Sequence, residues 1–71
     1  MVHRPERVLL TVLDERGPTR VTALATELDT HPITITQYCD DLQSDGYVYR
    51  VSADVYAISE AGRERLASLA E

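Results

Sequence analysis

A short stretch in the middle of the chain carries side chains that can contact the edges of DNA bases. Thr34, Thr36 and Gln37 supply polar groups, and Ile33 stands just before them. Glutamine can pair with adenine through two hydrogen bonds, threonine can donate or accept one, and isoleucine can contact a thymine methyl group. The stretch therefore favours readout of A·T base pairs. The alternatives are packing of Ile33 against the protein, and a solvated helix face for Thr36 and Gln37.

Residues on either side of this stretch have groups that contact phosphates in protein–DNA complexes. The candidates are Arg20, Thr22, His31, Tyr38 and Arg50. Backbone N–H groups at helix N-termini, here near Thr22 and over residues 30–33, would add donors without side-chain charge. The alternatives are solvation or ion pairing for Arg20 and Arg50, and a turn or cap role for His31.

Two short helices must position these candidates. The first has apolar residues at helical spacing, namely Val21, Leu24, Ala25 and Leu28. Residues 29–31 interrupt that pattern, and Pro32 suits the first turn of a second helix over about residues 32–45. Two helices joined by such a turn form a helix-turn-helix, whose second helix enters the major groove of DNA.

The second helix has an inner and an outer side. Its apolar residues at helical spacing are Ile35, Cys39 and Leu42. If these point inward, helical geometry places on the outer side Ile33, Gln37, Asp40 and Ser44, with Thr34 and Thr36 beside them. Asp40 would then either accept a hydrogen bond from cytosine or, like Asp41, lie beyond the groove.

The N-terminal part of the chain is predicted to form a helix over about residues 5–16. The apolar residues expected to share one face of it are Val8, Leu9, Val12 and Leu13. Gly17 and Pro18 end this helix. Residues 19–21 are rich in β-branched side chains and are predicted to add a strand beside a later hairpin.

The C-terminal part is predicted to form a hairpin over residues 47–58 and a helix from Ser59 almost to Glu71. Aromatic residues of the hairpin are assigned to the core or the sheet rather than to base stacking: Tyr47, Tyr49 and Tyr56. The connections should depend on Thr22 and Ser59 as helix N-caps, and on Gly46 and Asp54 as left-handed residues.

Several motifs together resemble a known family. They are Leu24-Ala25, Ile35, Cys39, Leu42, Gly46-Tyr47-Val48 and the run from Tyr56 to Gly62. Over about residues 6–66 the chain resembles winged helix-turn-helix transcriptional regulators, most closely small haloarchaeal phage-repressor-like proteins. The resemblance implies one α+β domain over residues 1–71, with a three-helix core, a hairpin wing and a C-terminal helix. It also implies a repressor that binds double-stranded DNA as a homodimer through its first and last helices.

The charge balance is unusual for a protein that approaches phosphate. Seven basic residues, all arginine, stand against 12 acidic ones, giving a net charge of −5. Such a composition resembles that of proteins from salt-loving archaea. Because the Debye length is only about 3 Å at 1 M salt, repulsion between distant carboxylates and phosphates would be weak there. The alternatives are a winged-helix protein–protein interaction module that binds a basic partner, and a dimer partner of a longer regulator.

Residues for other chemistry are scarce. His3, His31 and Cys39 do not have the spacing of a zinc site. No nucleophile elbow, phosphate loop or metalloprotease pattern occurs, so we expect neither an enzyme nor a cofactor, and no small-molecule ligand is evident. Cys39 is predicted to be buried. The sequence contains neither a signal peptide nor an apolar run of about 20 residues, which predicts a cytoplasmic protein without a membrane partner.

Overall fold

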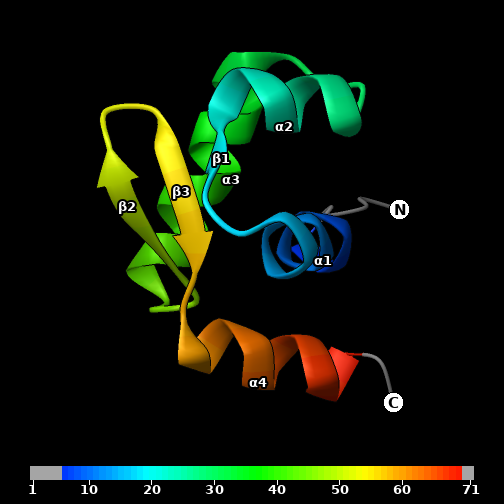
Figure 1. Ribbon diagram of the computed structural model, residues 1–71, viewed down its shortest axis with the longest axis vertical. Helices are drawn as coiled ribbons and strands as arrows, with labels where there is room; N and C mark the ends of the chain where they lie inside the picture. Colours follow the sequence, from blue (N-terminus) through cyan, green and yellow to red (C-terminus); the bar gives the residue numbers. More distant parts are fainter. Residues whose placement is uncertain (1–5, 70–71) are drawn as a thin grey trace.

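Four helices and a three-stranded antiparallel sheet make up the computed structural model, which describes residues 6–69 (Figure 1). The elements are α1 Glu6–Arg16, β1 Thr19–Arg20, α2 Val21–Glu27, α3 Pro32–Ser44, β2 Val48–Ser52, β3 Val55–Ile58 and α4 Glu60–Leu69. The predicted α+β winged helix-turn-helix is confirmed. Pro5 and Glu71, the predicted ends of the first and last helices, lie outside the described residues.

The sheet has the strand order β1-β3-β2, so β3 lies in the middle. The predicted extra strand is present: Thr19 of β1 pairs with Tyr56 of β3. On the other side of β3, Val48 of β2 pairs with Ile58, and Arg50 pairs with Tyr56. The sheet places Tyr56 in the core at 1% exposure, whereas Tyr49 on the edge strand β2 is 51% exposed.

One apolar core is shared by the helices and the sheet. It consists of Leu9, Leu10, Leu13, Val21, Leu24, Ala25, Ile35, Cys39, Leu42, Val48, Tyr56 and Ile58. The prediction that Val8 faces inward is wrong, because Val8 is 52% exposed and Leu10 is buried in its place. Helix α1 packs against both α4 and β3, so its buried side extends from Leu9 and Leu13 toward Leu10.

The start of α2 differs from the prediction. Thr22 is not the N-cap, since the helix begins at Val21 and the cap position belongs to Arg20, whose side chain makes no capping hydrogen bond. Instead, the backbone N–H of Val21 donates to the carbonyl oxygen of Asp54 at 2.8 Å. The first N–H group of α2 is therefore bound by the carbonyl oxygen of a residue in the hairpin turn, and not by the threonine hydroxyl that was predicted to cap the helix.

Left-handed backbone occurs at Gly46 (φ +84°), as predicted, but not at Asp54. The hairpin has an irregular register between Arg50 and Ser52, and neither residue of its turn, Ala53 or Asp54, has a positive φ. Among residues 6–69, the non-glycine residue with positive φ is Asp29 (φ 49°), in the turn between α2 and α3. Aspartate tolerates this conformation better than most residues. Asp29 therefore marks the turn that ends α2 and connects it to α3.

The predicted N-cap at Ser59 is confirmed. Its Oγ accepts a hydrogen bond from the backbone N–H of Gly62 at 3.0 Å, and its hydroxyl donates to the carbonyl oxygen of Gly46 at 2.6 Å. Ser59 thus connects the start of α4 to the turn that follows α3. The sheet, the end of α3 and the last helix are held together at this point.

Candidate nucleic-acid interface

Helix α3 presents the predicted outer side to solvent. Ile33 is 64% exposed and Gln37 is exposed, whereas Ile35 and Cys39 have no exposed surface. Figure 1 shows α2 and the β2–β3 turn at one end of the molecule and α4 at the other. The fold therefore leaves one side of α3 uncovered within the described chain, next to the wing.

The two threonines beside this outer side are half-buried. The hydroxyl of Thr36 donates to the carbonyl oxygen of Pro32 at 3.0 Å, one turn earlier in the helix. The oxygen of that hydroxyl keeps its capacity to accept a hydrogen bond, while its proton is committed. Thr34 makes no such bond in the described structure and can both donate and accept.

His31 forms the N-cap of α3. Its Nδ1 atom accepts a hydrogen bond from the backbone N–H of Ile33 at 3.2 Å, and its carbonyl oxygen accepts one from Ile35. The cap role, which the sequence left as an alternative to phosphate contact, is therefore present in the free protein. It leaves the other ring nitrogen free to donate to a ligand.

An open hollow separates α2 from the start of α3. It has a volume of about 440 Å³ and is lined by Thr22, Ala25, Thr26, Asp29, Thr30, His31 and Pro32. Thr22 and His31, nine positions apart in the sequence, both line this hollow. Both side chains are exposed. Exposed groups can contact the surface of a large ligand, whereas groups in an enclosed cavity contact a small one.

Of the six arginines in the described residues, three form ion pairs and three, Arg7, Arg20 and Arg50, do not. Within residues 6–69, ion pairs join Arg16 to Glu27, Arg63 to Asp14 and Arg65 to Glu6, and the last two connect α4 to α1. Arg20 and Arg50 take part in none of these pairs and are exposed. The described structure thus leaves without an ion pair the two arginines that the sequence singled out for phosphate contact.

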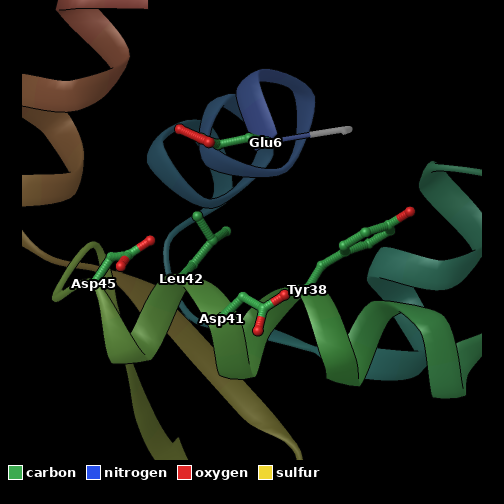
Figure 2. Close-up of a pocket in the computed structure, with 5 residues that line it drawn as sticks. All are labelled: Glu6, Tyr38, Asp41, Leu42 and Asp45. Carbon is green, nitrogen blue, oxygen red and sulfur yellow. The ribbon is translucent and has the colours of Figure 1, made fainter. Parts of the chain in front are cut away.

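Tyr38 is half-buried and lies on the side of α3 that lines a pocket with α1, not on its exposed outer side. It lines a small pocket with Glu6, Asp41, Leu42 and Asp45. Figure 2 shows the carboxylate side chains of Glu6 on α1, of Asp41 on α3 and of Asp45 just after the end of α3. The pocket volume of about 20 Å³ is enough for one water molecule. Of the nine predicted residues, Tyr38 therefore has the surroundings least suited to a phosphate.

Asp40 has a partner that sequence reasoning missed. The hydroxyl of Tyr56 donates to its Oδ1 atom at 3.2 Å, and the guanidinium carbon of Arg50 lies 5.8 Å from the centroid of the Tyr56 ring. Burial raises the pKa of the Tyr56 hydroxyl, and the nearby Arg50 acts against that rise. No sequence signal connects residues 16 positions apart, since their contact depends on how the sheet packs against α3.

Three further features of residues 6–69 concern metal binding, the single cysteine and membrane-spanning helices. These residues hold no group of three or more histidine, cysteine, aspartate and glutamate side chains that could bind a metal ion. Cys39 is buried as predicted, and burial, with Asp40 as a smaller contribution, raises the pKa of its thiol to about 11. No helix over residues 6–69 is both long and apolar enough to cross a membrane.

Comparison with known proteins agrees with this geometry. The crystal structure of RV1404 from Mycobacterium tuberculosis superimposes with a TM-score of 0.87 and 21% sequence identity, which establishes a common fold. The match covers 97% of this chain but only 51% of RV1404, so the chain spans about half the length of that protein. No curated protein matches.

The family model of the MarR family matches residues 2–54, which is more than half of the chain. This family consists of winged-helix transcription regulators rather than enzymes. The resemblance to winged-helix regulators is thereby confirmed, while the likeness to haloarchaeal phage-repressor-like proteins stays a prediction. By both the match and the fold, the chain belongs to the MarR family.

Proposed function

We propose that this chain is a sequence-specific regulator of transcription that binds double-stranded DNA. In this proposal α3 enters the major groove, and the wing, formed by β2 and β3, touches the backbone or the minor groove. The observation that carries it is the uncovered outer side of α3, where Ile33 is 64% exposed and Gln37 is also exposed. An exposed isoleucine beside polar groups at a helix N-terminus suits base edges and thymine methyl groups.

The residue roles divide into base readout and phosphate contact. We assign base readout to Ile33, Thr34, Thr36 and Gln37. We assign phosphate contact to Arg20, Thr22, His31 and Arg50. Tyr38, the remaining candidate, is left out of this assignment because three carboxylates line its pocket. Support for the second group is the freedom of Arg20 and Arg50 from the ion pairs that engage Arg16, Arg63 and Arg65.

The negative net charge defines the conditions under which this chain should work. At −5, long-range repulsion opposes binding at low ionic strength. Concentrated salt screens that repulsion beyond a few ångströms, so the close contacts decide affinity. We therefore propose a cytoplasm rich in salt, as in halophilic archaea, as the setting in which the protein meets its DNA.

We further propose that the regulator is a homodimer and a repressor. Regulators of this family typically dimerise. Helices α1 and α4 are joined by the pairs Glu6–Arg65 and Asp14–Arg63, and α1 has an outward surface on which Val8 is 52% exposed. A two-fold axis through this surface would present two copies of α3 to successive major grooves, about 34 Å apart. Occupation of such a site would block transcription.

Selection from a random double-stranded DNA library at high salt, followed by gel-shift assays, tests the proposal. The expected result is enrichment of a two-fold symmetric site with half-sites one helical turn apart. Ile33→Ser should weaken binding to that site, whereas Ser68→Ala on α4, at the opposite end of the molecule, should not. A folded protein that enriches no sequence would contradict the proposal.

A further inference from the structure

Tyr56 lies at the junction of the recognition helix and the wing. It belongs to the central strand β3 and pairs with Thr19 on one side and Arg50 on the other. Its side chain is 1% exposed, yet its hydroxyl reaches the Asp40 carboxylate of α3 at 3.2 Å. One buried side chain thus connects the exposed face of α3 to the sheet.

Arg50 lies next to the same side chain. Directly paired residues on neighbouring strands project to the same face of a sheet, so Arg50 and Tyr56 share a face. The guanidinium carbon of Arg50 lies 5.8 Å from the Tyr56 ring centroid, within the range of a cation–π contact. Asp40, Tyr56 and Arg50 therefore form a continuous link from α3 to the edge strand of the wing.

The contact with Tyr56 restricts the conformations of the long Arg50 side chain. An exposed arginine on an edge strand samples many rotamers, and ordering it on DNA costs conformational entropy. A ring beneath the guanidinium restricts that freedom before DNA arrives. The ring is in turn fixed by its hydrogen bond to Asp40, because a buried hydroxyl without a partner is unfavourable.

We propose that Asp40 and Tyr56 are positioning residues that hold Arg50 of the wing in a fixed place relative to α3. The proposal rests on the proposed DNA-binding function. It gives Asp40 a purpose on a face where its charge alone would oppose phosphate: its carboxylate acts within the protein rather than on a base. The wing and the recognition helix then approach DNA as one unit.

Two substitutions at Asp40 separate the hydrogen bond from the charge. Asp40→Asn and Asp40→Ala both remove the negative charge, but only Asp40→Asn keeps an oxygen that can accept from Tyr56. On the site selected by the wild-type chain, we expect Asp40→Ala to bind about threefold to tenfold more weakly than Asp40→Asn. Tyr56→Phe, which keeps the ring and its packing, should abolish this difference.

The contribution of Arg50 is the decisive measurement, because a merely structural role of Tyr56 would leave it unchanged. Arg50→Ala should weaken binding and lower the salt slope by about 1 in the wild-type background. In the Tyr56→Phe background the same substitution should cost less in both respects. Equal costs in the two backgrounds would overturn the proposal.

A DNA-free readout accompanies the binding data. The nuclear magnetic resonance signal of the Arg50 Nε–H group should shift in Tyr56→Phe, and it should shift further in Asp40→Ala than in Asp40→Asn, which loses the same charge but keeps the acceptor. Thermal melts of each variant verify that it is folded. If the wild-type chain binds DNA and the Arg50 and Tyr56 effects are additive, this proposal alone fails; if the wild-type chain binds no DNA, the proposed function fails with it.

Discussion

Gly62 of α4 lies directly against the backbone carbonyl group of Tyr47, with no room between them for a side chain. A Cβ atom on Gly62 would overlap that carbonyl oxygen and lie 2.7 Å from the Cγ1 atom of Ile58. The first turn of α4 therefore rests on the backbone that leads into β2. This close approach sets the position of the last helix relative to the wing.

Gly62→Ala should destabilise the fold by about 1–3 kcal/mol, the usual cost of forcing extra atoms into a packed site. In an exposed helix the same change would stabilise by up to about 1 kcal/mol, so the expected sign is the reverse of helix propensity. Urea denaturation measures the free energy of unfolding. Ser68→Ala on the same helix is the control and should change it little; a Gly62→Ala variant as stable as the wild type would contradict the observed approach.

Stability should fall as pH rises from about 9 to about 11, because of Cys39. Burial raises the pKa of its thiol from the ordinary 9.0 to about 11, so in this window the unfolded chain releases a proton that the folded chain keeps. The stabilisation is fully present below pH 9 and is lost toward pH 11, with a total loss of about 2–3 kcal/mol. Urea denaturation at successive pH values measures it.

The control for this prediction is Cys39→Ala. Its free energy of unfolding should change less with pH between about pH 9 and 10, below the range in which tyrosines titrate. In the wild type, the thiol should also react with alkylating reagents at the rate of global unfolding, since Cys39 has no exposed surface. An identical pH profile for both proteins would show that Cys39 does not cause the loss.

Substitutions of Arg20 and Arg63 can be compared to find out which side of the molecule contacts phosphates. Arg20 precedes α2 and is free of ion pairs in the described structure, whereas Arg63 is paired with Asp14 on the other side of the molecule. Arg20→Ala should reduce the slope of log affinity against log salt by about 1, uniformly across DNA sequences. Arg63→Ala should leave it unchanged, and equal effects would argue against a specific role for Arg20.

Val8→Asp tests the proposed dimer surface. Because Val8 is 52% exposed in the described single chain, a charge there should not disturb the core. Within a dimer it would be buried against its symmetry mate at considerable cost. Sedimentation velocity should show a dimer for the wild type and a monomer for Val8→Asp, with both proteins equally helical by circular dichroism. A dimer unaffected by the change would place the interface elsewhere.

The sequence predicted most of the fold because local signals agreed with one another. Pro32, Gly46 and Ser59 each marked an element boundary through backbone chemistry that needs no tertiary context. The apolar spacing of Ile35, Cys39 and Leu42 identified the inner side of α3 correctly.

The failures arose where tertiary contacts decided the outcome. Val8 and Leu10 lie close to the edge of the same helical stripe, and packing of α1 against two elements chose between them. Thr22 looked like a cap, but the Asp54 carbonyl contacts the start of α2 instead. The Asp40–Tyr56 hydrogen bond likewise depends on a register that no local pattern reveals.

The most direct test of the account is base discrimination by Gln37. Affinities for the selected DNA site and for its single-base variants would be measured for the wild type and for Gln37→Ala. We predict that the wild type discriminates at one base step by about 1–3 kcal/mol and that Gln37→Ala loses this preference while still binding. An unchanged preference at every base step would contradict the claim that the outer side of α3 reads DNA.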